Sequence, residues 1–138
     1  MKVSVFTDGG SRGNPGPSGF GVVIHGEQGE IIAKLSKYIG VGTNNEAEYY
    51  ALIEALYWLR DNKTIHSISE ATFYADSQLM VRQLQGKYKV KAPNIRPLFT
   101  TATALLQDLK IDYKFSDIPR EQNSLADELA NIAMDRKS

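Results

Sequence analysis

The alternation of apolar and polar positions predicts a chain that begins with β-strands. Apolar runs cover Val3 to Phe6, Phe20 to Ile24 and Ile31 to Leu35, and the last two face each other across Gly26 to Gly29. Short apolar runs bounded by glycine and proline are typical of strands, and a short glycine-containing connection is typical of a β-hairpin. We therefore expect three antiparallel strands at the start of the chain.

A helical period replaces this alternation from Thr43 to Arg60. Thr43 and Glu46 have capping-box spacing, which gives Glu46 a capping role at the helix start. At about 100° per residue, Glu48 falls on the apolar face, in line with Leu52. A lone ionised carboxylate there would cost on the order of several kcal/mol unless it is paired or bound to a metal. Glu48 therefore has a functional role, a salt bridge to lysine or arginine, or access to water near the helix end.

Strands and helices alternate in the second half of the chain. We expect a strand over Ala71 to Ala75, a short helix from Ser77 to Gly86, a helix capped by Asn94 and ending at Leu109, a strand over Ile111 to Phe115, and a helix over Leu125 to Arg136. A strand–helix–strand order demands parallel pairing of the two strands. The element order is thus three antiparallel strands followed by an α/β arrangement.

The last helix carries a carboxylate with two possible roles. Ser124 and Asp127 again have capping-box spacing, while Leu125, Leu129 and Ile132 recur as the expected core stripe. Asp127 projects away from that stripe, near the positive end of the helix dipole. A carboxylate at this position can be both a cap and a ligand.

Composition limits the class of protein. The chain has 138 residues, 42% hydrophobic and 23% charged, which predicts one soluble globular domain spanning residues 1–138. It has no cysteine and only two histidines, so a metal would take oxygen or imidazole ligands, and oxygen is favoured. No long apolar run or leader is evident, and we expect a cytoplasmic protein, a monomer, without membrane contact. A formal net charge of zero argues against binding nucleic acid through bulk electrostatics.

Two aspartates stand where predicted strands end. Asp8 follows the first apolar run and is succeeded at once by Gly9 and Gly10, so we expect the strand to break there. Asp76 closes the strand over Ala71 to Ala75, although it also suits a helix cap. Ligands of parallel sheets gather at the carboxyl ends of strands, so the two aspartates are expected to be neighbours at a metal site.

A basic stretch lies between the predicted short helix and the helix that follows. Lys87, Lys89 and Lys91 flank Tyr88 and Val90 in this stretch, which Arg96 extends. Basic residues interleaved with an aromatic are typical of a contact that tracks a nucleic-acid backbone. An exposed solvated loop accounts for the same pattern equally well.

Four ordered motifs resemble those of the type 1 ribonuclease H family, most closely its short branch. They are FTDGGSRGNPGPSGFG, TNNEAEYYAL, YADSQ and NSLADELAN, and together they span nearly the whole chain. Several motifs in a fixed order are far more specific than any one of them. The resemblance implies a mixed five-stranded sheet, three antiparallel strands and then two parallel ones, flanked by helices.

The resemblance also implies an activity and its residues. Members cleave the RNA strand of RNA–DNA hybrids, leaving 3′-hydroxyl and 5′-phosphate ends, with two Mg²⁺ or Mn²⁺ ions per site. The four metal-binding carboxylates of the family fall on Asp8, Glu48, Asp76 and Asp127. Residues expected to line the groove and read RNA 2′-hydroxyls are Gly10, Ser11, Asn14, Asn44, Asn45 and Gln78, with Thr43 expected to hold a DNA phosphate.

The chain departs from the family pattern in two places. Many members have a histidine in the loop before the last helix, but here the loop reads DIPREQN, and Arg120 or Glu121 is a candidate for part of that role. The long basic protrusion of some members is also missing, which predicts weaker binding. Two alternatives stay open: a catalytically silent nucleic-acid-binding module, and a broader nuclease that also cuts double-stranded RNA.

Overall fold

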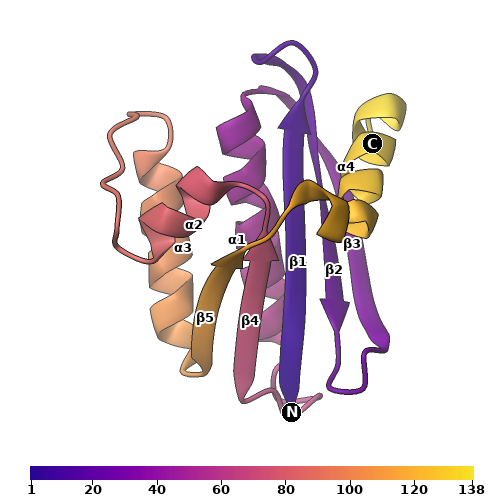
Figure 1. Cartoon of the computed structure of the whole chain (residues 1–138), viewed down its shortest axis with the longest axis vertical. Coiled ribbons are helices and arrows are strands. Elements are labelled where there is room, and N and C mark those ends of the chain that lie inside the picture. The colour runs from indigo at the N-terminus through magenta and orange to yellow at the C-terminus, as the bar shows by residue number, and fades with distance from the viewer.

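The computed structural model describes all 138 residues and is built on one five-stranded sheet. The strands are β1 (Lys2–Ser11), β2 (Gly16–His25), β3 (Ile31–Gly42), β4 (Glu70–Ala75) and β5 (Asp112–Asp117). Their order in the sheet is β3-β2-β1-β4-β5 (Figure 1). β1, β2 and β3 pair antiparallel, whereas β4 is parallel to both β1 and β5. The predicted mixed sheet is therefore confirmed.

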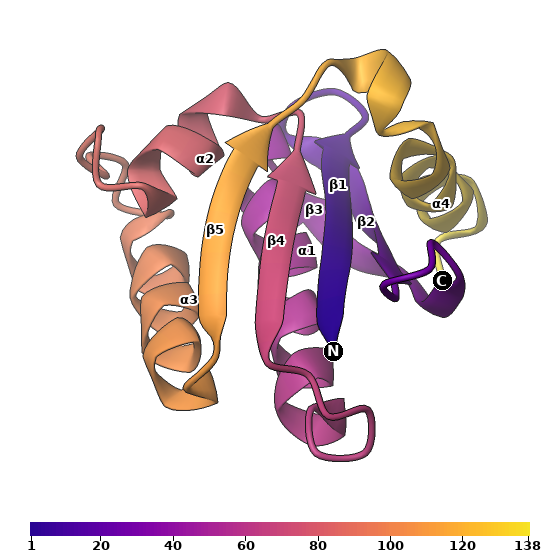
Figure 2. The same cartoon turned by 60° about the horizontal axis from the view of Figure 1, so that its bottom comes forward.

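Four α-helices flank the sheet. They are α1 (Asn44–Asn62), α2 (Gln78–Leu84), α3 (Arg96–Leu109) and α4 (Ser124–Arg136), with a 3₁₀ turn over Arg120–Gln122. α1 lies against one face and packs against α2 and α3, while α4 lies on the opposite face across β1, β2 and β3 (Figure 2). The main core forms between α1 and the sheet, around buried residues such as Val5, Leu52 and Phe73. No helix is both long and apolar enough to cross a membrane.

β1 does not break after Asp8, so the sequence prediction was wrong on this point. The strand continues to Ser11, which pairs with Ser18 of β2. Its parallel ladder with β4, in contrast, ends at the pair Thr7 and Ala75. Gly9 and Gly10 do not end the strand, because both pair with β2 in the antiparallel ladder. Asp8 thus lies directly beyond the end of the parallel pairing, where β1 and β4 separate.

The absence of a side chain at Gly9 allows α1 to approach β1. A Cβ placed on Gly9 would lie 2.3 Å from the carbonyl carbon of Ala47 and 2.5 Å from the backbone nitrogen of Glu48. No side chain fits in that space, because real Cβ atoms do not approach backbone atoms so closely. Gly9 therefore brings the first turns of α1, and with them Glu48, against the strand that carries Asp8.

α4 packs through alanines rather than through the predicted leucine stripe. The residues buried against the sheet are Ala126, Ala130, Ala133 and Met134, and the expected stripe of Leu125, Leu129 and Ile132 is only half-buried. Opposite the helix, a Cβ on Gly21 would lie 2.3 Å from the carbonyl oxygen of Ala126. Because β2 offers glycine there, the helix approaches the sheet closely enough for the small side chains of Ala126 and Ala130 to be buried against it.

Two predicted helix caps were wrong and one was confirmed. The Thr43 hydroxyl accepts from the Glu46 N–H at 3.1 Å, and the Glu46 carboxylate accepts from the Thr43 N–H at 2.9 Å. α3 begins at Arg96 without a side-chain cap from Asn94, because the turn before it is closed by the Ala92 carbonyl.

The predicted capping box of Ser124 and Asp127 is also absent. α4 follows Asn123 directly, and no side chain caps its first turn. Asn123 donates its own backbone N–H to the Arg120 carbonyl, so the 3₁₀ turn leads straight into the helix. Asp127 is therefore not engaged as a cap.

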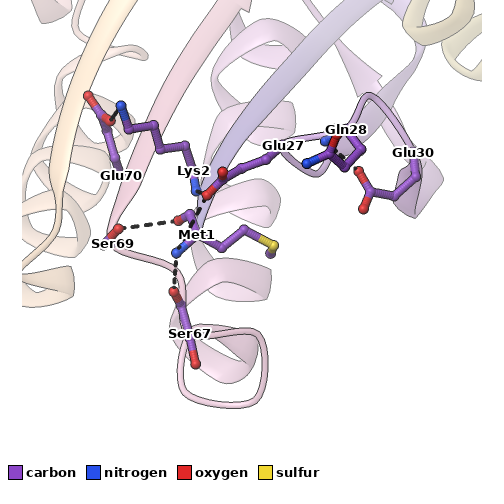
Figure 3. Close-up of polar contacts among 8 residues, drawn as sticks. All are labelled: Met1, Lys2, Glu27, Gln28, Glu30, Ser67, Ser69 and Glu70. Atoms are coloured by element: carbon purple, nitrogen blue, oxygen red, sulfur yellow. Dashed lines mark hydrogen bonds and ion pairs between the residues drawn. The ribbon is translucent and has the colours of Figure 1, made fainter.

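A polar network holds the end of the sheet where β1 and β4 begin, opposite the end that carries Asp8 and Asp76 (Figure 3). The Lys2 N–H donates to Glu27 Oε1 at 2.6 Å, and Lys2 Nζ lies 3.5 Å from Glu70 Oε2. The Ser69 N–H donates to the Met1 carbonyl at 2.9 Å. These contacts join the starts of β1 and β4 to the β2–β3 hairpin, which fixes the strands whose far ends carry Asp8 and Asp76.

Candidate active site

Three carboxylates from distant parts of the chain converge where β1 and β4 separate. Asp8 comes from β1, Glu48 from α1 and Asp76 from the position directly after β4, and one oxygen of each lies within 4.8 Å of the others. Asp8 is 5% exposed and Glu48 is 7% exposed. The structure confirms that Glu48 lies on the buried face of α1, as the helical periodicity predicted. It also confirms that Asp8 and Asp76 are neighbours, as predicted from their positions at strand ends.

Asp127 joins this cluster from the first turn of α4. It lies outside the tight trio, but its carboxylate lines the same groove, and its negative charge helps to raise the pKa of Asp8. Its backbone N–H donates to the Asn123 carbonyl at 3.1 Å. The structure therefore gathers all four predicted carboxylates, three closely and the fourth beside Asp8.

The cluster is electrostatically strained without a cation. Burial raises the pKa of Asp8 from 3.8 to about 8, and the negative charges of Asp76 and Asp127 add to the effect. Burial also raises the pKa of Glu48 well above its usual value, reinforced by Asp8 and Asp76 and opposed by a hydrogen bond from the Gly9 amide. Like charges in a poorly solvated place disfavour ionisation of each other.

The donor set fits a hard divalent cation. Glu48 Oε2 is buried and has no hydrogen-bond partner. A buried polar atom without a partner is rare in proteins, and a metal ion would supply one. All available donors are carboxylate oxygens, the ligands that Mg²⁺, Mn²⁺ and Ca²⁺ prefer. Asp8, Glu48 and Asp76 could hold such an ion, with Asp127 within reach of the same groove.

Asp76 is not a helix cap. Ser77 caps α2 instead, because its hydroxyl accepts from the Met80 N–H at 3.3 Å. The Asp76 side chain is 13% exposed, and Arg120 Nε lies 3.9 Å from its Oδ2 atom. Capping of α2 therefore does not explain Asp76, whose carboxylate lines the groove.

A groove of about 570 Å³ opens above the carboxylates. Of the residues predicted to touch substrate, those that line it are Gly10, Ser11, Asn44 and Asn45. An adjoining pocket of about 370 Å³ is lined by Asn14 and Thr43, again with Asn44 and Asn45. Gln78 is exposed and belongs to neither lining, and Ser77 lines the groove at that corner instead.

Hydrogen bonds fix the polar rim of the groove, formed by Ser11, Asn14 and Asn44, where the loop between β1 and β2 meets the start of α1. The Ser11 N–H donates to Asn44 Oδ1 at 2.8 Å, and the Asn44 N–H donates to Asn14 Oδ1 at 2.9 Å. The Ser11 hydroxyl donates to the Gly42 carbonyl at 2.7 Å. Asn45 makes no such side-chain bond and is exposed, which leaves its amide free for a ligand.

Asn123 is a structural support of the site that sequence reasoning missed. It is 2% exposed, and its Nδ2 donates to the Thr7 carbonyl at 2.8 Å. Through this bond and its backbone bond to Asp127, it ties the start of α4 to the residue before Asp8. An asparagine in a polar loop gives no periodic signal, so only the long-range contact reveals it.

Comparison with known proteins places the chain in a family. The family described as reverse transcriptase-like matches residues 6–133. Ribonuclease HI of Haemophilus ducreyi is 32% identical over 143 residues, which cover 94% of this chain and 88% of that protein. The chain belongs to the type 1 ribonuclease H family.

Other members of the ribonuclease H family match over nearly the whole chain. The bifunctional protein Rv2228c of Mycobacterium tuberculosis is 42% identical over 137 residues, 98% of this chain but only 36% of that protein. The chain thus spans about a third of that relative. The structure of LC11-RNase H1 in complex with RNA/DNA hybrid superposes with a TM-score of 0.92 and 44% identity, covering 98% of each chain.

The loop where many ribonucleases H carry a histidine reaches the groove here without one. Ile118, Pro119 and Arg120 line the groove, and the Arg120 side chain is 81% exposed. Glu121 is exposed and lies outside the lining. Of the two candidates that the sequence left for this role, only Arg120 faces the carboxylates.

The carboxylate cluster predicts how stability of the metal-free protein depends on pH. Because the folded state raises the pKa of Asp8 from 3.8 to about 8, it binds a proton more tightly than the unfolded chain. The contribution to stability is therefore greatest at the acid end and is lost as pH rises through this window. We expect the urea midpoint in chelator to fall over that range, and divalent cations to restore it. A wild-type profile no steeper than that of Asp8→Asn would contradict this.

Proposed function

We propose that this domain, residues 1–138, is an endonuclease that hydrolyses the RNA strand of RNA–DNA hybrids. The observation that carries the proposal is the convergence of Asp8, Glu48 and Asp76, with an unpartnered buried oxygen, on the floor of an open polar groove. Two relatives support it: one is named ribonuclease HI, and LC11-RNase H1 was solved with RNA/DNA hybrid.

Asp8, Glu48, Asp76 and Asp127 would hold the metal, for which we propose two Mg²⁺ ions, with Mn²⁺ as a substitute. Bound divalent cations supply an activated water and stabilisation of the leaving 3′-oxygen. Because the pKa of Asp8 and of Glu48 is raised in the free protein, these groups release protons when they become ligands. The oxygen of water would form a bond to phosphorus and lose a proton to solvent, while the bond from phosphorus to the 3′-oxygen breaks and that oxygen takes up a proton. The products are 5′-phosphate and 3′-hydroxyl ends.

The rim residues are suited to recognise RNA. A 2′-hydroxyl both donates and accepts hydrogen bonds, and it distinguishes RNA from DNA. Asn45 offers both an amide donor and a carbonyl acceptor at the groove, beside the backbone of Gly10 and Ser11. We place the DNA strand toward the adjoining pocket of Asn14 and Thr43. Gln78 stays a predicted contact that requires movement of its side chain toward the groove.

Arg120 takes part of the role of the missing loop histidine by electrostatics alone. A guanidinium stays protonated at all physiological pH values, so it does not act as a general acid or base. Its Nε lies 3.9 Å from Asp76 Oδ2, and the side chain extends into solvent at the groove. From there it attracts the phosphate that enters or leaves the site.

The test is a substrate panel with end-labelled RNA–DNA hybrid, double-stranded RNA and DNA duplex, each in Mg²⁺, in Mn²⁺ and in chelator. We expect cutting of the RNA strand of the hybrid with either metal and none with chelator. Binding of the hybrid without cutting would favour the silent binding module. Equal cutting of double-stranded RNA would favour the broader nuclease.

The basic stretch between α2 and α3 predicts salt-sensitive binding. Lys89 and Lys91 are exposed, next to Ala92 at the adjoining pocket. A plot of log affinity against log salt has a negative slope, and each lost phosphate contact makes this slope shallower by about 0.9. We therefore expect the double variant Lys89→Gln, Lys91→Gln to make the slope for hybrid, measured in chelator by fluorescence anisotropy, shallower by up to about 1.8.

The matched control for this experiment removes two lysines from the far end of the sheet. Lys2 and Lys114 line a separate surface hollow there, remote from the carboxylates. Lys2→Gln, Lys114→Gln changes net charge equally and is expected to leave the slope nearly unchanged. An equal drop in both double variants, or no drop in either, would show that the basic stretch does not touch phosphates.

A further inference from the structure

Arg12 lies in the groove, outside both the carboxylate cluster and the rim formed by Ser11, Asn14 and Asn44. It follows the last residue of β1 and lines the same groove as the carboxylates. Arg12 and Arg120 are the only cationic residues of that lining. The two arginines come from different segments, one from the loop after β1 and the other from the 3₁₀ turn before α4.

α4 holds the Arg12 guanidinium in place. Nη1 donates to the Asp135 carboxylate, and Nη2 donates to Asn131 Oδ1 at 3.2 Å. Asn131 in turn donates through Nδ2 to the Asp127 carbonyl at 3.0 Å. The guanidinium is thus oriented by the helix that carries Asp127, through residues about one and two turns beyond it.

Stability does not account for this arrangement. The side chains of Arg12 and Asp135 are 47% and 60% exposed, and ion pairs this exposed contribute little to folding. A guanidinium has five N–H donors, and only two are engaged here. The remaining donors are available to a ligand that enters the groove.

We propose that Arg12 binds a phosphate of the RNA strand beside the one that is cleaved. This rests on the proposed function. Four carboxylates on the floor of the groove repel a polyanion, and a cation at the rim offsets that repulsion. Arg12 directly follows Ser11, on the side of the groove assigned to RNA. The planar fork of arginine matches two phosphate oxygens, so it binds them in place of Asp135.

The experiment compares Arg12→Gln with Asp135→Asn. Affinity for the hybrid is measured in chelator by fluorescence anisotropy over a salt series, with the urea midpoint of each variant as a check of folding. Arg12→Gln is expected to make the salt dependence of affinity shallower by about 0.9 in the slope of log affinity against log salt. It is also expected to raise KM several-fold with little change in kcat, because the lost phosphate contact is equally strong in the bound substrate and in the transition state. Asp135→Asn removes a competing carboxylate and is expected to strengthen binding.

A third variant separates charge from geometry. Arg12→Lys keeps the charge but loses the planar fork, so we expect it to keep the wild-type salt slope with weaker affinity. An unchanged slope in Arg12→Gln, or the same loss of affinity in Arg12→Gln and Asp135→Asn, would overturn the proposal and leave a purely structural ion pair. If the wild type itself neither binds nor cuts hybrid, the proposed function fails instead.

Discussion

Asp8→Asn is expected to abolish cleavage of the hybrid while making the metal-free protein more stable. Asp8 lies at the centre of the cluster, where Glu48, Asp76 and Asp127 all influence the pKa of its carboxyl group. The amide has nearly the same shape but binds a hard cation poorly, so we expect single-turnover cleavage in Mg²⁺ to fall by about 10³-fold or more. Above pH 8, where the wild type carries this buried and repelled charge, the variant should have the higher urea midpoint in chelator.

The opposite signs of these two effects separate function from folding. Asp61→Asn is a matched control, because Asp61 lies at the far end of α1 with a side chain that is 61% exposed. It is expected to leave both cleavage and stability near wild type. An Asp8→Asn protein that cuts hybrid within tenfold of the wild-type rate, or that is less stable in chelator, would contradict the role given to the cluster.

Gly9→Ala is expected to be strongly destabilising. The new methyl group would lie 2.3 Å from the Ala47 carbonyl carbon and 2.4 Å from its oxygen, and neither backbone atom can rotate away. α1 would have to move off β1 and open the core around it. We expect a loss of about 3 kcal/mol or more in the free energy of unfolding, measured by urea titration.

Gly10→Ala is the neighbouring control for this prediction. Its Cβ would lie 3.4 Å from the Met134 Cε atom, an ordinary contact with a flexible side chain. We expect it to change the free energy of unfolding by less than about 1 kcal/mol. Similar losses at Gly9 and Gly10 would mean that strand conformation, and not the approach of α1, decides the effect.

The parts of the fold that were predictable from the sequence depend on local signals. The hairpin between β2 and β3 and the capping box of α1 each depend on residues that are close together in the chain. The burial of Glu48 followed from helical periodicity, and the meeting of Asp8 with Asp76 followed from strands that end on aspartate. Topology then needed only the rule that a strand–helix–strand unit is parallel.

The parts that were not predictable depend on residues far apart in the chain. The face that α4 presents to the sheet is set by glycines of β2, so a leucine stripe identified from α4 alone was misleading. Asn123 supports the site through a carbonyl 116 residues away, and Arg12 is held by a carboxylate 123 residues away. Neither partner can be read from a local pattern.

Single-turnover cleavage of one end-labelled RNA–DNA hybrid by the wild type and by Asp76→Asn, in Mg²⁺, in Mn²⁺ and in chelator, decides whether the carboxylates form a metal-dependent nuclease site. Asp76 is chosen because it is less buried than Asp8 and does not cap α2. We predict that the wild type cuts only the RNA strand and only with metal, and that the variant does not cut. Hybrid left intact by the wild type under every metal condition, or full cutting by Asp76→Asn, would contradict the account.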